Sequence, residues 1–514
     1  MRRSILATWV VLSGCSASTD SFLMDAENDL TSVSARSRTL EFAGYVYVDR
    51  NASDATILQR VREQTQSAFG ALRTSEISVN SRELKDVDPK TFVKEDVLVR
   101  TGADETTSTP MSRVRYRYKD NALVPKSMAR RSALPLAVLG NGYRLKTSRI
   151  LKECTADDSE AHEFSSSIWY VFEPSLSQCQ QAISSEQESI DKEAVLLHDG
   201  EVGQLEIERL YIPITVSLGP DATNRGKSYP EYERMYRGGV KSDALVIGMV
   251  NGAIDHGSHD SLAEDSGWEE WMTQLDETFG DRAFKVSNID PVEDLTSFTV
   301  GNKTVSAPNG FADVLRWQLR GDVPAGTDPK ALLGAASTKI ANHWITFRLA
   351  VKVRIADEAP RDFAIEVLTY FGAGGDQTPH KFAIKNSDVF IYNGHSYIGY
   401  GPLDPSRFSA EDFPASYQLF FVDSCVSYNY YERDYISLKA GGTKNLDLIT
   451  NGLEAPSWRS GYALGRFANL LTSGKGASYR DLLQVAMATD SLRVVDGEVG
   501  NEYDPAKVPI EVTF

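Results

Sequence analysis

The stretch Tyr417-Gln-Leu-Phe-Phe-Val-Asp-Ser-Cys425 carries an apolar run directly into a thiol. A continuous apolar run of this kind is typical of a strand buried on both faces of a parallel sheet. The same form occurs upstream in Asp388-Val-Phe-Ile-Tyr-Asn-Gly-His395, which ends in an imidazole. Functional groups of parallel sheets lie beyond the carboxyl ends of the strands, so neighbouring strands would bring the two side chains together. The pair predicts a cysteine nucleophile with a histidine base.

Small and polar residues flank both reactive groups. Gly394 and Ser424 are small, which lets the backbone turn sharply and leaves the imidazole and the thiol accessible. The carboxylate of Asp423 either orients His395 or faces elsewhere, and the sequence does not decide between the two.

From residue 241 the pattern alternates between strands and helices. This alternation predicts an α/β domain with a mostly parallel sheet covered by helices on both faces. One segment departs from it: residues 345–353 alternate apolar and polar side chains, and residues 363–370 return as a second strand. We interpret 345–370 as an inserted antiparallel hairpin that either leans over the site or extends the sheet. The other expected elements are strands 244–250, 284–288 and 445–450 and helices 265–279, 311–319 and 458–471, with a further helix opening at 478.

The first half of the chain predicts a separate α+β domain without a catalytic motif. Its expected elements are strands 40–48, 114–118, 169–172 and 205–216 and an amphipathic helix over 54–72. A polar stretch with Gly and Pro then favours a domain boundary. The predicted organisation is a signal peptide 1–14, a flexible tether 15–38, the α+β domain 39–217, a linker 218–240, the α/β domain 241–490 and a C-terminal extension 491–514.

Residues 241–490 resemble the caspase–gingipain–clostripain superfamily of cysteine peptidases. The resemblance rests on a His after one apolar core strand and a Cys after the next, here His395 and Cys425. It implies a caspase-like fold and hydrolysis of peptide bonds in a protein or peptide substrate by this dyad, without a cofactor. In the family a Gly commonly follows the His, and its amide helps to hold the oxyanion. Ser396 stands there in this chain, with Gly394 before the His instead.

The N-terminus resembles a bacterial lipoprotein signal peptide. Arg2 and Arg3 precede a short apolar segment, which leads into Leu12-Ser-Gly-Cys15, a match to the lipobox. The apolar segment is too short to span a bilayer as a helix. The resemblance implies that Cys15 becomes the acylated N-terminus of a lipid-anchored envelope protein. Ser16 in the next position favours the outer membrane.

An exported protein meets conditions in which disulfides persist. Of its four cysteines, Cys15 is the lipidation site that the resemblance implies, and Cys154 and Cys179 lie on either side of an apolar segment. We predict that these two form a disulfide, which leaves Cys425 as an odd thiol. An odd thiol in an exported protein indicates a reactive residue or intermolecular pairing.

Charge and motif content exclude other classes of function. With 54 basic and 71 acidic side chains the formal net charge is −17, which argues against nucleic acid as a partner. The sequence contains no phosphate-binding loop and no Gly-x-Ser-x-Gly motif. His256 and His259 follow the first core strand without a third ligand at a metal-site spacing, so no metal is predicted. Two functions remain: an envelope-anchored cysteine endopeptidase, or a non-catalytic surface lipoprotein that binds a protein or envelope component.

Replacing Cys15 by Ala tests the lipid anchor. The Cys15→Ala variant should be released from the membrane or misprocessed, because the acyl chains can no longer be attached. Fractionation of cells and intact mass measurement of the mature protein provide the check. Identical processing and membrane attachment of the variant would contradict the lipobox interpretation.

Overall fold

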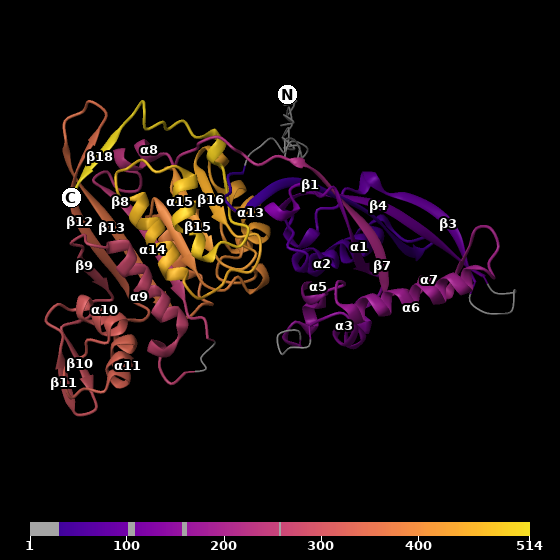
Figure 1. Ribbon diagram of the computed structural model, residues 1–514, viewed down its shortest axis with the longest axis horizontal. Helices are drawn as coiled ribbons and strands as arrows, with labels where there is room; N and C mark the ends of the chain where they lie inside the picture. Colours follow the sequence, from indigo (N-terminus) through magenta and orange to yellow (C-terminus); the bar gives the residue numbers. More distant parts are fainter. Residues whose placement is uncertain (1–29, 101–107, 157–161, 256–258) are drawn as a thin grey trace, which may run out of the picture.

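The computed structural model describes residues 30–100, 108–156, 162–255 and 259–514. It contains two large sheets, each with helices packed on it, which lie side by side along the long axis of the molecule (Figure 1). The predicted α/β class is therefore confirmed. The predicted signal peptide, Cys15 and most of the predicted tether lie outside the described residues. No helix within the described ranges is long and apolar enough to cross a membrane.

The N-terminal half is built on a seven-stranded sheet with the order β5-β7-β1-β4-β3-β6, in which β2 also pairs with β4. β1 and β4 pair antiparallel from Ala35 to Asp49 of β1 and form the long central pair of this sheet. Its elements are β1 (Ala35–Asp49), α1 (Asp54–Gln66), α2 (Ala68–Thr74), β2 (Ser78–Val79), β3 (Val93–Arg100), β4 (Ser108–Pro125), β5 (Ala133–Leu139), α3 (Thr147–Glu153), α5 (Ile168–Val171), α6 (Ser177–Ala194), β6 (Glu201–Gly203), α7 (Gln204–Ile207) and β7 (Tyr211–Asp221).

Several local predictions in this half are wrong. Residues 30–38 are not a tether, because Thr31 bridges to Val495 and β1 already begins at Ala35. The predicted helix over 54–72 is two helices that meet at Ser67. The apolar segment 169–172 forms most of the short helix α5 instead of a strand, and 205–216 opens with the helix α7 before β7 begins. Short apolar runs do not distinguish a strand from a buried helix.

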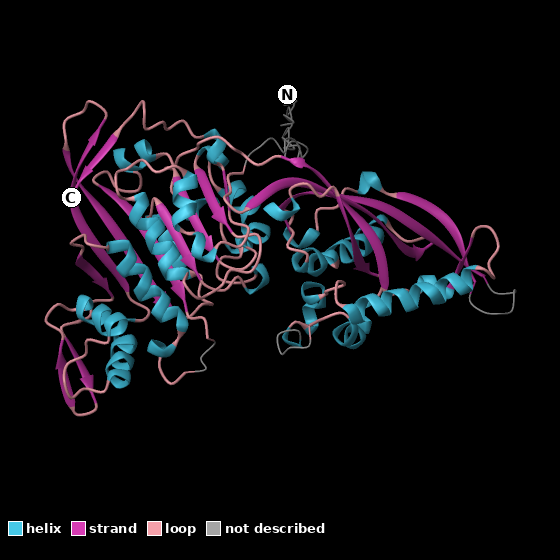
Figure 2. Cartoon of the chain, viewed as in Figure 1, coloured by secondary structure: helices cyan, strands magenta, loops and turns pink. Residues whose placement is uncertain are grey.

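The C-terminal half is built on a nine-stranded mixed sheet with the order β17-β16-β15-β14-β8-β13-β12-β18, in which β9 also pairs with β12. Figure 2 shows helices packed against its strands. The five strands from β16 to β13 are parallel to one another. The pairings of β17 with β16, of β12 with β13, and of β18 and β9 with β12 are antiparallel, so the sheet is mixed and not mostly parallel as predicted. Its elements are α8 (Tyr232–Gly238), β8 (Ala244–Gly252), α9 (Ser266–Phe279), β9 (Lys285–Asp290), β10 (Ser297–Val300), β11 (Lys303–Ser306), α10 (Phe311–Arg320), α11 (Pro329–Ile340), β12 (Trp344–Ile355), β13 (Arg361–Gly372), α12 (Thr378–Asn386), β14 (Val389–Asn393), β15 (Gln418–Asp423), α13 (Ser427–Leu438), β16 (Leu446–Thr450), α14 (Ser460–Leu471), α15 (Tyr479–Val485), β17 (Val494–Asp496) and β18 (Ile510–Thr513).

Helices cover both faces of the parallel strands, which explains why those strands are apolar throughout. β8, β14, β15 and β16 are buried at every position. On one face α9 and α14 pack together and insert Trp268, Trp271 and Phe467 into the core. On the other face lie α12 and α13, whose core is continuous with that of the N-terminal half.

The structure also corrects the predicted boundaries of the α/β domain. Residues 345–370 form the predicted antiparallel hairpin, and of the two alternatives it extends the sheet. Because β13 pairs in parallel with β8, it is a central strand and not an insertion. The predicted linker 218–240 contains the end of β7 and the helix α8, whose Tyr232, Met235 and Tyr236 are buried. The predicted extension 491–514 supplies β17 and β18 to the main sheet. The domain thus runs from α8 to the C-terminus.

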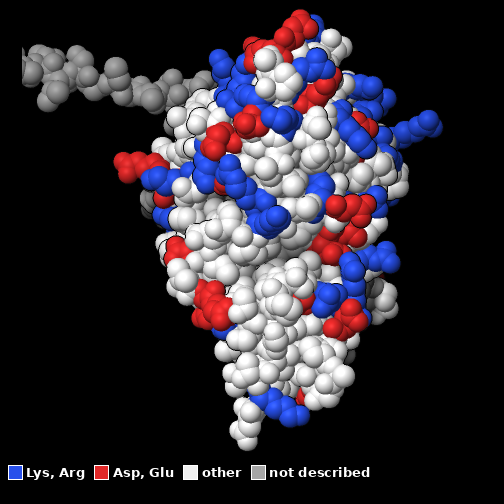
Figure 3. Space-filling view, turned by 90° about the vertical axis from the view of Figure 1, so that its left-hand side faces the viewer, with Lys and Arg blue, Asp and Glu red and all other residues white. Residues whose placement is uncertain are grey.

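The sheet edge at β12 and β18 is charged on its outer surface. Arg354 pairs with Glu511 of β18, and Lys352 pairs with Asp362 of β13. Figure 3 views the molecule from this side, and basic and acidic side chains alternate over its upper part, whereas the end that carries β10 and β11 is mostly uncharged. Charged side chains on an edge disfavour pairing with a strand of another molecule.

Cys154 and Cys179 form a disulfide, as predicted, with their Cα atoms 4.6 Å apart. Both residues are fully buried. The bond ties the end of α3 to the start of α6 across α5. Because it closes a loop in the unfolded chain, it stabilises the N-terminal half mainly by restricting the unfolded state.

Replacing both cysteines of this bridge by Ser should lower the free energy of unfolding of the N-terminal half by about 3 kcal/mol, the value typical of a loop of this length. Urea unfolding followed by tryptophan fluorescence measures the difference. An unfolding midpoint equal to that of the unaltered protein under non-reducing conditions would show that the bridge contributes nothing to stability.

Candidate active site

His395 and Cys425 follow two neighbouring parallel strands at the same edge of the sheet. β14 and β15 pair in register up to Asn393 and Asp423, and His395 and Cys425 each lie two positions beyond that last pair. Both side chains are partly exposed, although every residue of the two strands is buried. The structure therefore brings the imidazole and the thiol to one rim.

A backbone carbonyl fixes the orientation of the His395 ring. Nε2 lies 2.8 Å from the carbonyl oxygen of Ile254, in the segment that follows β8. A carbonyl oxygen only accepts, so Nε2 carries the proton and donates it. In the neutral ring Nδ1 is then the basic nitrogen, the form that a general base requires.

A tight turn presents the thiol to the loop that follows β16. The Sγ atom of Cys425 lies 3.9 Å from the carbonyl oxygen of Ala455. Directly after the cysteine, Val426 adopts a φ of 52° and donates its amide to the carbonyl of Leu453 at 3.0 Å. A β-branched residue at positive φ is a strained conformation, of a kind that clusters at functional sites.

Tyr392 supports the turn that carries His395. Its hydroxyl donates to the carbonyl oxygen of His395 at 2.9 Å. Burial raises the pKa of Tyr392 well above its usual value, and the neighbouring Tyr431, Tyr397 and Cys425 act in the same direction. A Cβ at Gly394 would lie 2.5 Å from the Tyr392 hydroxyl, so only glycine leaves room for this hydrogen bond. Gly394 thus has a structural role beneath the imidazole.

The loop after His395 is held by the helix after Cys425. Ser396 is buried, and its carbonyl oxygen accepts a hydrogen bond from the Tyr431 hydroxyl of α13 at 3.1 Å. Tyr397 and Ile398 have φ values of 49° and 53°, unusual for residues other than glycine. The two segments that carry His395 and Cys425 are therefore tied to each other as well as to the sheet.

Asp423 faces away from His395. Its carboxylate forms a fully buried ion pair with Arg493, whose guanidinium lies 2.8 Å away, and accepts from the Asn451 amide at 2.6 Å. Arg493 also donates to Asn451 and to the carbonyl oxygens of Ala486 and Thr489. The network anchors the end of β15 to the start of the loop that reaches Cys425, so Asp423 supports the site and does not orient the imidazole.

Sequence reasoning missed Arg493, Ile254 and Ala455. Arg493 lies in a segment without a recognisable motif, and its partners become neighbours only through the fold. Ile254 and Ala455 contribute main-chain carbonyls, which no side-chain pattern identifies. Tyr392 was visible as an apolar position of the strand, but its hydrogen bond to the His395 carbonyl depends on the turn at Gly394.

The histidine loop after β8 does not form a metal site in the part that the structure describes. His259 pairs with Asp255 at 3.2 Å, and Asp255 also accepts from the amide and hydroxyl of Ser266 at the start of α9. His256 lies outside the described residues. Among the residues described, no cluster of three or more His, Cys, Asp or Glu side chains is arranged to hold a metal ion.

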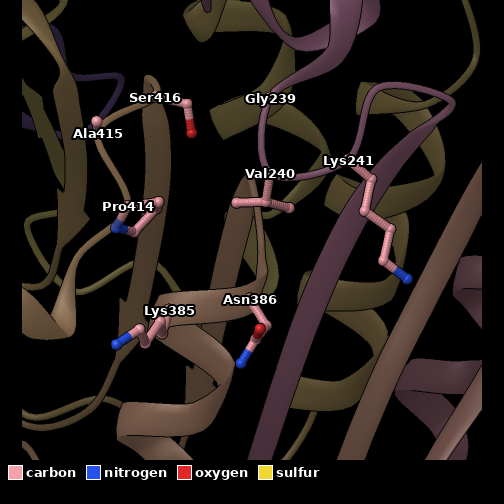
Figure 4. A pocket seen from close by; sticks show the side chains of 8 residues that line it. All are labelled: Gly239, Val240, Lys241, Lys385, Asn386, Pro414, Ala415 and Ser416. Atoms are coloured by element: carbon pink, nitrogen blue, oxygen red, sulfur yellow. The ribbon is translucent and has the colours of Figure 1, made fainter.

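A cavity of about 350 Å³ lies at the opposite edge of the sheet, where β8, β14 and β15 begin (Figure 4). Lys241 and Lys385 point away from each other there, and Lys241 pairs with Glu366. The lining contains neither a cysteine nor a histidine and is remote from the dyad along the strands. It consists of Gly239, Val240, Lys241, Lys385, Asn386, Pro414, Ala415 and Ser416.

Comparisons with known proteins identified no relative of this chain. No family model matches the chain, and no curated protein or solved structure is significantly similar to it.

Replacing Arg493 by Met should lower the free energy of unfolding by about 3–5 kcal/mol, because it leaves the Asp423 carboxylate buried without its counter-charge. Chemical denaturation measures the loss. The matched control is Arg466→Met on the exposed side of α14, which should change stability by less than about 0.5 kcal/mol. Equal stability of the two variants would refute a supporting role for the buried pair.

Proposed function

We propose that the chain is an envelope-anchored cysteine endopeptidase in which Cys425 is the nucleophile and His395 the general base and acid. The anchor would be the acylated Cys15, and the substrate a protein or peptide. The observation that carries the proposal is the placement of His395 and Cys425 at equivalent positions beyond the paired strands β14 and β15. The resemblance to caspase-like peptidases names the same two residues.

The ring orientation of His395 supports the same chemistry. Because the Ile254 carbonyl holds the Nε2 proton, Nδ1 can take the thiol proton and stabilise the thiolate as an ion pair. The thiolate then attacks the carbonyl carbon of the scissile peptide bond. When the tetrahedral intermediate collapses, Nδ1 returns the proton to the departing amine and a thioester forms on Cys425. His395 next deprotonates a water molecule, which hydrolyses the thioester and regenerates the thiol.

The rival function is a non-catalytic envelope protein with the same fold. Position 396 favours it, because Ser396 replaces the glycine whose amide helps to hold the oxyanion in the family that the chain resembles. Loss of one oxyanion donor typically slows turnover by about a hundred- to a thousandfold. A binding protein would retain the fold and the partner surface without peptide-bond cleavage.

Cleavage of a diverse peptide library distinguishes the two functions. The Cys425→Ala variant should lose all cleavage, and His395→Ala should lose about a hundredfold or more, the usual contribution of a general acid–base group. His198→Ala, which removes an exposed histidine in the N-terminal half, is the matched control and should cleave like the unaltered protein. Cleavage that persists without the thiol, or an unaltered protein that cleaves no peptide, would reject the endopeptidase.

A further inference from the structure

The N-terminal half packs directly against the helix that follows Cys425. α13 lies where the two halves of the molecule meet (Figure 1), and a single apolar core runs from the N-terminal sheet to the underside of β14 and β15. At this junction Phe69 of α2 stacks on Tyr430 of α13, with ring centroids 6.2 Å apart. Tyr430 in turn leaves no space for a Cβ at Gly399, in the loop after His395. The interface therefore reaches the loops of the site.

On the thiol side, three side chains form a polar latch between the halves. Arg73 of α2 pairs with Glu454, and the Tyr170 hydroxyl of α5 donates to the same carboxylate oxygen at 2.9 Å. The Arg73 guanidinium also covers the Tyr170 ring, 4.6 Å from its centroid, and donates to the Tyr170 carbonyl. Charge, stacking and hydrogen bonding thus fix Tyr170 and Glu454 against each other.

This latch lies next to the thiol. Glu454 directly precedes Ala455, whose carbonyl oxygen is 3.9 Å from the Cys425 sulfur. Burial raises the pKa of Tyr170 well above its usual value. The neighbouring Glu454 and Cys425 raise this pKa further, whereas the positive charge of Arg73 lowers it. The hydrogen bond to Glu454 therefore holds Tyr170 one residue away from the carbonyl that contacts the sulfur.

A second set of contacts holds the imidazole side. Arg82 donates to the Gly399 carbonyl oxygen at 2.8 Å and pairs with Asp404 at 3.2 Å. Tyr400, in the same loop, donates its hydroxyl to Glu83 at 2.7 Å. Residues of the N-terminal half thus hold both loops that flank the dyad.

We infer that the N-terminal half supplies one wall of the cysteine site: Tyr170, latched between Arg73 and Glu454, encloses Cys425 and limits the size of the group that reaches its sulfur. The wall restricts the approach of a substrate to the remaining open side of the site. The inference rests on the position proposed for the active site, but its test reads the accessibility of the thiol and requires no peptidase activity.

The rate of modification of Cys425 by two reagents of different size tests this wall. In Arg73→Gln and in Glu454→Gln the rate with a bulky aromatic disulfide should rise by about threefold or more, whereas the rate with small iodoacetamide rises less. The double variant should react no faster than either single variant, because both changes open the same latch. Tyr170→Phe removes only the hydroxyl and has a minimal effect on folding. In this variant too, the rate of Cys425 modification by the bulky disulfide should rise more than the rate with iodoacetamide.

Arg60→Gln is the matched control, since Arg60 is exposed on α1 and pairs only within that helix. Thermal unfolding of each variant verifies that the fold is retained. Rates equal to those of the control in all latch variants would refute the wall. An equal rise with both reagents would also refute it, because general loosening exposes the sulfur to small and large reagents alike. Failure of the peptidase assay with a size-selective rise in rate would leave the wall in place and reject the proposed chemistry alone.

Discussion

The parallel pairing of β14 with β15 is the constraint on which the site depends. The hydrogen bonds of the pair fix Asn393 opposite Asp423. This register also sets the positions of His395 and Cys425, two residues further along each chain segment. A shift by one residue would turn each side chain to the other face of the sheet, where the core is packed around different side chains. Because helices cover both faces, the apolar side chains of the two strands enforce this single register. The imidazole and the thiol reach one rim as a consequence of core packing.

The rim itself is held in an unfavourable backbone conformation. Val426, Tyr397 and Ile398 all have positive φ values next to the two reactive residues. Each such residue costs about 1–3 kcal/mol, so the surrounding packing must offset the strain. The buried tyrosines of α13, the Arg493 network and the N-terminal half provide that packing from three directions. This arrangement explains why groups distant in the sequence converge on two short turns.

Much of the fold was predictable, because strands buried on both faces leave a strong signal. The runs before His395 and Cys425 identified two central strands and the edge of the sheet where their side chains meet. The groups that support the site were not predictable. Ile254 and Ala455 act through main-chain carbonyls, and Arg493, which is distant in the sequence, lies next to Asp423 only in the folded protein. Asp423 shows the same limit: the sequence left open whether its carboxylate orients His395 or faces elsewhere, and only the folded chain reveals its ion pair with Arg493. The predicted end of the α/β domain was wrong because β17 and β18, which lie beyond it in the sequence, pair with strands of the main sheet.

The most direct test of the peptidase proposal is to trap the thioester on Cys425. A peptide that the protein cleaves would be mixed with it, the reaction quenched in acid within the first turnover, and the intact protein weighed. The proposal predicts a mass increase equal to the acyl half of the peptide, located on Cys425 and removed by hydroxylamine. Cleavage without any adduct on Cys425, or an adduct on another residue, would contradict it.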